Sequence, residues 1–89
     1  MRKEVDFRHR DRFVELGLTI ASLRRMKGYS QEQLAERADI SRSFLSLIET
    51  PNTCVSFSVD ILLSIADALD VRPGDLLNTT LPGTKPKEE

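Results

Sequence analysis

Residues 30–49 read SQEQLAERADISRSFLSLIE and contain the signals for two short helices in close succession. The Ser30 hydroxyl can accept a hydrogen bond from the amide of Gln33, and the Gln33 side chain can bond the amide of Ser30. This reciprocal pair is the capping box that begins many helices. Ser41 is a second N-cap residue, and Pro51 ends the helix that follows it. The pattern predicts one helix over residues 31–38 and a second over residues 41–49, joined by a turn at residues 39–40.

The junction between these helices contains the residue types that a tight turn requires. Asp39 is one of the few non-glycine residues that tolerate a positive φ, and Ala35 is small where the helices would cross. The apolar positions around the junction supply a buried face: Leu34, Ala38, Ile40, Leu45 and Ile48. Two short helices joined in this way are typical of a helix-turn-helix unit, whose second helix enters the major groove of DNA.

Three further helices are expected around this unit. Apolar residues at spacings of three and four predict an amphipathic helix over 11–27, which Gly28 would end in the left-handed conformation. A serine cap opens a fourth helix over 58–69, and a proline opens a fifth over 73–77. The predicted fold is all-α, a compact five-helix bundle.

The chain of 89 residues is long enough for one domain. We divide it into a basic N-terminal extension (residues 1–10), a helix-turn-helix domain (residues 11–77) and a mobile C-terminal tail (residues 78–89). The formal net charge is −1, yet residues 1–47 carry ten Lys and Arg against seven Asp and Glu, and residues 58–89 carry three against six. A chain polarised in this way can offer a positive face to phosphates, although two ordinary solvated faces would give the same counts.

Several functions are not expected from this composition. The one histidine, His9, and the one cysteine, Cys54, supply neither a Ser/His/Asp set nor the three or four ligands of a metal site. We expect Cys54 to be a half-buried loop thiol rather than a redox switch, because no basic residue lies near it in the sequence. No apolar run approaches the ~20 residues of a membrane span, and no signal-peptide pattern is present. We expect a cytoplasmic protein with no enzymatic activity, cofactor or metal.

Over residues 16–77 the sequence resembles the Xre/Cro/CI family of bacterial and phage helix-turn-helix regulators. The resemblance is carried by a series of matches in register: Leu16-Gly17, Ile20, Leu23-Arg24, Gly28, Ser30-Gln31, Leu34-Ala35, Ser41-Arg42-Ser43, Ile48-Glu49, Ile65-Ala66-Asp67-Ala68-Leu69 and Asp75-Leu76-Leu77. It implies a lambda-repressor-like fold and a transcriptional repressor. Such a protein binds double-stranded DNA at a pseudo-palindromic operator, as a homodimer formed through its C-terminal half.

The resemblance also implies roles for three polar residues. Gln31 matches a glutamine that binds a DNA phosphate and braces the reading helix, although it can also be read as an ordinary exposed helix residue. Arg24 matches an arginine that pairs with the glutamate at Glu49. Because this ion pair is structural, we count neither partner as a DNA contact.

Four residues of the helix over 41–49 face away from its apolar stripe and are the candidate base readers: Arg42, Ser43, Ser46 and Leu47. Arg42 can donate a bidentate pair to guanine or clamp a phosphate. Leu47 departs from the family, which often has a polar or basic residue there. It can touch a thymine methyl group or pack against a partner helix.

The loop over 50–57 also departs from the family, because it contains no cation. The candidate phosphate contacts are Ser30, Gln31, Asn52 and Thr53. The basic N-terminal segment can add contacts as an arm, but we expect it to be solvated and idle. The uncharged loop, Leu47 and the net charge leave a second interpretation open, in which the same fold binds a protein partner as an antitoxin-like subunit or a bridging factor.

Overall fold

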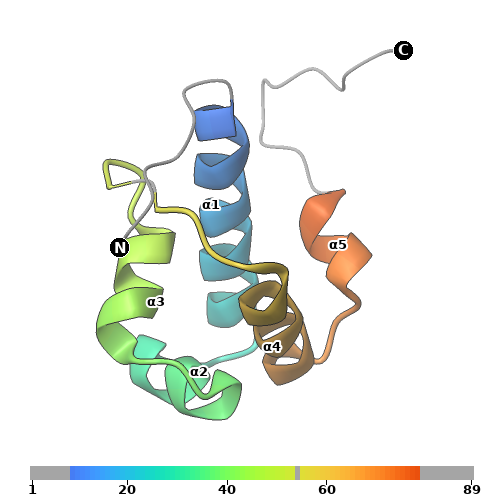
Figure 1. Ribbon diagram of the computed structural model, residues 1–89. Helices are drawn as coiled ribbons and strands as arrows, with labels where there is room; N and C mark the ends of the chain where they lie inside the picture. Colours follow the sequence, from blue (N-terminus) through green and yellow to red (C-terminus); the bar gives the residue numbers. More distant parts are fainter. Residues whose placement is uncertain (1–8, 54, 79–89) are drawn as a thin grey trace.

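The computed structural model of the chain describes residues 9–53 and 55–78. These residues form five α-helices and no β-strand: α1 (Arg10–Met26), α2 (Gln31–Ala38), α3 (Arg42–Glu49), α4 (Val59–Leu69) and α5 (Pro73–Leu77) (Figure 1). The predicted all-α five-helix bundle is confirmed, with α1 beginning and ending one residue earlier than expected. The predictions for Cys54 and for most of the N-terminal extension and the C-terminal tail concern positions outside the described residues.

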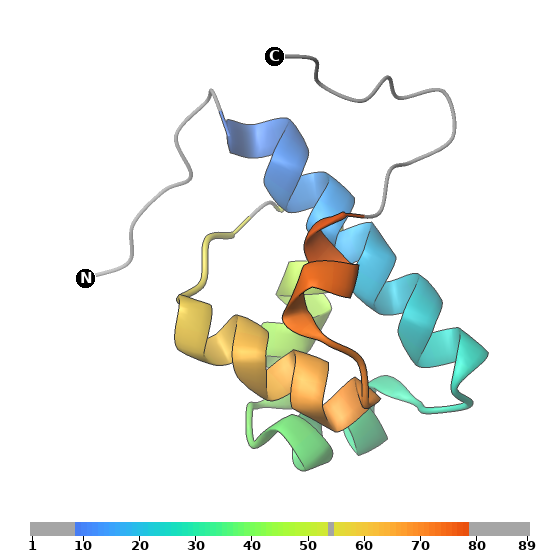
Figure 2. The same ribbon diagram turned by 90° about the vertical axis from the view of Figure 1, so that its right-hand side faces the viewer.

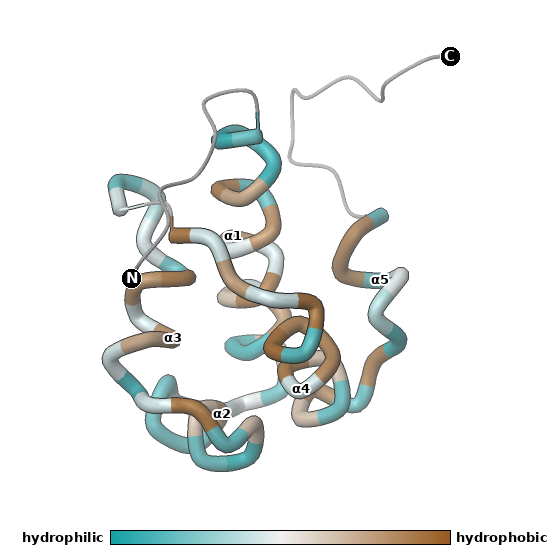
Figure 3. Tube along the Cα trace, viewed as in Figure 1, coloured by the Kyte–Doolittle hydropathy of each residue, from teal (hydrophilic) through white to brown (hydrophobic). Residues whose placement is uncertain are grey.

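The helices pack around α1, which is the longest of the five. Helix α1 contacts α3, α4 and α5, while α2 contacts both α3 and α4. Figures 1 and 2 show α3 and α5 on different sides of α1, and in Figure 1 α2 lies at the bottom of the view, beneath α3. Figure 3 shows hydrophilic residues along α2 and at both ends of α1, and hydrophobic residues along α4. The helix-turn-helix unit therefore lies at one edge of the bundle.

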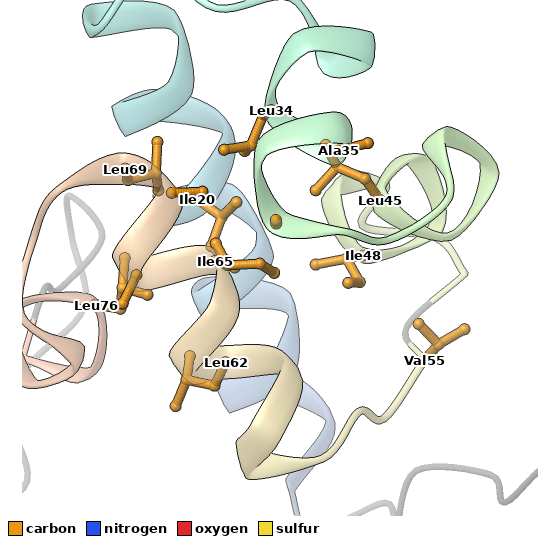
Figure 4. Close-up of a cluster of buried hydrophobic side chains, with 13 residues drawn as sticks. Ile20, Leu34, Ala35, Leu45, Ile48, Val55, Leu62, Ile65, Leu69 and Leu76 are labelled. Atoms are coloured by element: carbon orange, nitrogen blue, oxygen red, sulfur yellow. The ribbon is translucent and has the colours of Figure 1, made fainter.

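Every helix contributes to one core (Figure 4). Its largest fully buried side chains are Ile20, Leu34, Leu45, Ile65, Leu69 and Leu76. Most of the apolar residues assigned to the unit are buried here, and Ile40 packs against the cluster at its edge. This burial is the main favourable contribution to folding and holds α2 and α3 against the other helices.

Serine side chains cap the N-terminal ends of three of the helices. The capping box at Ser30 is complete: Ser30 Oγ accepts from the Gln33 amide at 3.0 Å, and Gln33 Oε1 accepts from the Ser30 amide at 2.9 Å. Ser41 Oγ accepts from the Phe44 amide at 3.0 Å, and Ser58 Oγ accepts from the Ile61 amide at 3.2 Å. Each bond satisfies an amide that the helix itself leaves without a partner.

Three helices are followed within two residues by one with positive φ. Gly28 has φ of 82°, and Asp39 and Asp70 have φ of 59° and 61°. At Asp39 the chain closes in a Schellman motif, with Ile40 N donating to Ala35 O at 3.0 Å and Asp39 N donating to Glu36 O at 3.2 Å. The positive φ expected at Asp39 is confirmed, whereas the same conformation at Asp70 was not anticipated. The left-handed residue at Asp39 makes the abrupt change of direction between α2 and α3.

Gly17 lies where α1 crosses the end of α3. A Cβ atom added at Gly17 would overlap the carbonyl oxygen of Ile48 and come within 3.1 Å of its carbonyl carbon. Both atoms belong to the backbone of a packed helix, so they cannot move aside as the end of a flexible side chain can. A glycine inside a helix costs roughly 1 kcal/mol relative to alanine, and here the close helix contact requires it.

We expect Gly17→Ala to lower the free energy of unfolding by about 1–3 kcal/mol, because the added methyl group overpacks this crossing. Urea denaturation followed by circular dichroism measures the change. Gly74→Ala is the matched control, since a Cβ there would meet only the Asn78 side-chain nitrogen at 4.0 Å, and its stability should be unchanged or slightly higher. Wild-type stability of Gly17→Ala would contradict the close approach of α1 and α3.

Candidate nucleic-acid interface

Helix α3 presents one face to the core and the opposite face to solvent. Leu45 and Ile48 are buried, while Arg42 and Ser43 are exposed. Leu47 retains 39% of its surface as an exposed apolar side chain. Ser46, the fourth candidate base reader, is half-buried. The structure therefore places Arg42, Ser43 and Leu47 where a ligand can reach them, with Ser46 at the margin of that face.

Arg24 and Glu49 meet at the junction of α1 and α3. Arg24 Nε donates to Glu49 Oε2 at 2.9 Å and Arg24 Nη2 donates to Oε1 at 3.1 Å, a bidentate pair. Both residues keep only 8% of their surface exposed. A third bond runs from Arg24 Nη1 to the Tyr29 carbonyl at 2.8 Å. This pair ties the C-terminal end of α3 to α1 and to the segment that leads into α2.

Gln31, at the first position of α2, links this ion pair to the exposed face of α3. Its Nε2 donates to Glu49 Oε1 at 2.9 Å, and its Oε1 accepts from Arg42 Nη1 at 3.5 Å. A side-chain amide carries two N–H groups, so one bond to Glu49 leaves a second N–H for another acceptor. The family resemblance implied that Gln31 braces this helix, but it did not identify the partners Glu49 and Arg42, which lie 18 and 11 positions away in the sequence.

The loop after α3 is held by two threonine hydroxyls. Thr50 Oγ1 donates to the Ser46 carbonyl at 2.6 Å, and Thr53 Oγ1 lies 2.8 Å from the Leu47 carbonyl and 3.0 Å from that of Thr50. These bonds satisfy carbonyl groups at the end of the helix. Asn52 is exposed. Asn52 and Thr53 are the two candidate phosphate contacts in this loop, and the Thr53 hydroxyl proton is already used in a hydrogen bond to the protein backbone.

Arg37 is also engaged within the fold. Its Nε donates to the Ala68 carbonyl at 3.0 Å, and its guanidinium lies 4.8 Å from the centroid of the Tyr29 ring, a cation–π distance. The contact joins α2 to the C-terminal end of α4, where the helix dipole favours a cation. The sequence indicated no partner for Arg37, because Ala68 offers only its backbone. Arg24 and Arg37 are therefore both turned toward protein groups.

Among residues 9–53 and 55–78, no group of three or more His, Cys, Asp or Glu side chains is placed to hold a metal ion. Within the same ranges, none of the helices has the length and apolar character needed to cross a membrane.

The capped helix α2, the left-handed turn at Asp39 and the partly exposed helix α3 together define a helix-turn-helix protein. Residues 17–81 match the model of the Cro/C1-type HTH DNA-binding domain. The chain belongs to this family, as its resemblance to Xre/Cro/CI regulators predicted.

Known relatives include transcriptional regulators. The chain is 40% identical over 63 residues to the HTH-type transcriptional regulator SinR of Bacillus licheniformis, an alignment that covers 71% of this chain and 56% of SinR. The match to SinR of Bacillus subtilis (strain 168) is 38% identical and covers the same shares. The chain thus spans little more than half the length of these curated relatives.

Solved structures of similar proteins support the same fold. The restriction-modification controller protein C.AhdI from Aeromonas hydrophila superimposes with a TM-score of 0.68 at 34% identity, covering 72% of this chain and 94% of C.AhdI. The biofilm master regulator SinR in complex with DNA superimposes with a TM-score of 0.65 at 38% identity, covering 71% of this chain and 98% of that chain.

The buried ion pair provides a stability test. Glu49→Leu leaves the Arg24 guanidinium buried without its carboxylate, and we expect it to lower the free energy of unfolding by about 3–5 kcal/mol. Adding Arg24→Met should recover most of the loss, because apolar groups of similar size replace both charges. A double-mutant cycle from urea denaturation measures the coupling. A loss below about 1 kcal/mol in Glu49→Leu, the size typical of an exposed ion pair, would contradict the burial described here.

Proposed function

We propose that this chain is a sequence-specific DNA-binding transcriptional repressor that inserts α3 into the major groove of an operator. The observation that carries the proposal is the exposed Arg42 on the outer face of α3, next to the Gln31 amide at the start of α2. This arrangement brings one candidate base contact and one candidate phosphate contact together on neighbouring helices. Family membership and the DNA complex of the similar protein SinR support the same interpretation.

Base reading is assigned to Arg42, Ser43, Ser46 and Leu47. Arg42 lies in the first turn of α3, the part of a recognition helix that enters the groove first, and its guanidinium can bond O6 and N7 of guanine. Ser43 and Ser46 can bond a base edge or a phosphate. Leu47 supplies an apolar surface that suits the methyl group of thymine.

Phosphate contacts are assigned to the start of α2 and to the loop after α3. The second N–H of Gln31 and the amides of the first turn of α2 can bond phosphate oxygens, which the positive end of the helix dipole favours. The Ser30 hydroxyl accepts a capping bond and still has its own proton to donate. Asn52 can contribute from the loop, whereas Thr53 shapes that loop through its bonds to the end of α3.

We further propose that the chain acts as a homodimer through its C-terminal half. Three large apolar side chains are exposed there, with exposed fractions of 69%, 42% and 62% for Val59, Leu63 and Leu77. Val59 and Leu63 are four residues apart on α4 and so share a face of that helix. A two-fold dimer built on this surface would present two copies of α3 to successive major grooves about 34 Å apart.

Two substitutions separate base reading from phosphate binding. Arg42→Ala should reduce the affinity ratio between operator and random DNA by roughly tenfold, because a bidentate arginine–guanine contact is worth about 1–3 kcal/mol. Gln31→Ala should weaken binding to both duplexes alike, since a phosphate contact carries no direct sequence information. Fluorescence anisotropy with a duplex selected by the wild-type chain from a random pool, and with an unrelated duplex, measures both effects.

Arg72→Ala is the control, because it removes the same charge from an exposed side chain in the C-terminal half. It should leave the affinity ratio unchanged. If neither Arg42→Ala nor Gln31→Ala alters binding, the proposed docking of α2 and α3 is wrong.

A second candidate function is a protein-interaction module on the same fold. The exposed Leu47, the loop without a cation and the internal contacts of Arg24 and Arg37 favour it. A salt titration of the selected duplex separates the two functions. The affinity for a duplex bound through several phosphates must fall steeply as the salt concentration rises. The affinity of an apolar surface for a protein partner should change little with salt.

The dimer surface has its own test. Leu63→Lys introduces a charge on α4 and should turn the dimer into a monomer, with operator affinity falling more than about tenfold because one half-site is lost. Sedimentation velocity measures the mass and anisotropy measures the affinity. Met26→Lys is the matched control, since Met26 is an exposed apolar residue of α1. A dimeric Leu63→Lys variant would place the subunit contact elsewhere.

A further inference from the structure

The orientation of the Gln31 amide is determined by the buried carboxylate of Glu49. That carboxylate can only accept hydrogen bonds, and its partners are Arg24 Nε, Arg24 Nη2 and Gln31 Nε2. A reversed amide would bring the Gln31 oxygen against a carboxylate oxygen and the amide N–H groups against the Arg42 guanidinium. The observed orientation instead directs the nitrogen to Glu49 and the oxygen to Arg42.

We propose that Glu49 is a positioning residue for DNA recognition, which acts through Gln31 to hold the guanidinium of Arg42. Glu49 lies at the last position of α3 and Arg42 at the first, so the link connects the two ends of the reading helix through a side chain of α2. Arg24 supplies the counter-charge that makes the buried carboxylate tolerable. The inference rests on the proposed function, because it assumes that Arg42 reads a base.

The link matters because Arg42 is exposed and its side chain is long. An untethered arginine samples many rotamers, and ordering it on binding opposes association. The contact between Arg42 Nη1 and Gln31 Oε1, at 3.5 Å, restricts the guanidinium while it remains within reach of the groove. A restricted arginine discriminates better between bases, since its hydrogen bonds form in one geometry.

The same amide can connect base reading to the DNA backbone. One N–H of Gln31 is directed at Glu49, its oxygen faces Arg42, and its second N–H can bond a phosphate. A phosphate docked on Gln31 would then fix the register of the duplex relative to Arg42. Sequence preference thus depends on Arg24 and Glu49, buried residues that do not themselves touch DNA.

The test compares the wild-type chain with two variants that keep Arg42. In Arg24→Met with Glu49→Leu, the buried charges are replaced together, so the net charge is unchanged and the non-specific, salt-dependent part of DNA binding is preserved. In Gln31→Met, the ion pair is kept and only the amide is removed. Because Gln31 lies at the surface end of α2, this second variant remains informative if the buried double replacement does not fold.

The first readout needs no DNA. The ¹⁵N relaxation order parameter of the Arg42 Nε–H group is measured in the free protein, with the exposed Arg25 as an internal reference. We expect the order parameter of Arg42 to exceed that of Arg25 in the wild-type chain. In both variants, the order parameter of Arg42 should fall to about the value of Arg25. An unchanged order parameter in the variants would overturn the link itself.

The second readout is the preference for one base pair over another at the position that Arg42 contacts. This position is the one where a base-pair substitution weakens DNA binding by the wild-type chain but not by Arg42→Ala. The probe is the duplex that the wild-type chain selects from a random pool. The preference at this position should fall by roughly fivefold to tenfold in the double replacement, within the range of a bidentate base contact, and this fall should exceed any weakening of binding to an unrelated duplex. In Gln31→Met, both duplexes should also bind more weakly, because the phosphate contact is lost.

Arg37→Met is the matched control, because it breaks a different internal contact of an arginine, to Ala68 and Tyr29. It should leave both readouts unchanged. A loss of Arg42 order without any loss of discrimination would overturn the positioning role. A wild-type chain that selects no sequence would instead refute the proposed function, and the order parameters would still decide whether Glu49 holds Arg42.

Discussion

The contact between α1 and α3 determines which face of α3 is exposed. At one point the two backbones meet at Gly17, where only a hydrogen atom fits against the Ile48 carbonyl. Nearby, the Arg24–Glu49 pair joins the same two helices with directional bonds. Apolar packing is non-directional, whereas the glycine contact and the ion pair each hold α3 at a defined point on α1. The exposed face of α3 follows from these two contacts.

Helix α2 depends on contacts from two sides. Its first residue, Gln31, is bonded to the ion pair, and its last turn is joined to α4 through Arg37 and the Ala68 carbonyl. Leu34 is fully buried between these points. A helix of eight residues has little stability by itself, so these tertiary contacts keep it folded and fixed in orientation. The helix-turn-helix unit is consequently held in place by its contacts with the rest of the bundle.

Local signals in the sequence predicted most of the fold. The caps at Ser30 and Ser41 and the left-handed turn at Asp39 involve groups within five residues of one another, so residue type and spacing suffice to predict them. Asp70 was equally local and was missed, although it precedes an apolar residue at a helix end just as Asp39 does. The pairings of Gln31 with Glu49 and of Arg37 with Ala68 span 18 and 31 residues. They depend on how helices cross, which residue spacing does not encode, and the Arg24–Glu49 pair was anticipated only through a family resemblance.

The distribution of charge explains why such a polar network matters in this protein. The charge of Arg24 is balanced by Glu49 and the loop after α3 has no cation, so Arg42 is the one cation in α3 and this loop. Affinity from counterion release rises with the number of phosphates neutralised, so the proposed DNA binding would gain little affinity of this kind from α3 and its loop. Two routes can compensate without added charge: a second copy of α3 in a dimer, and an arginine that is already held in the conformation that binds. In the proposed complex with DNA, the exposed apolar residues of α4 and α5 would serve the first route, and the chain of bonds from Arg24 to Arg42 would serve the second.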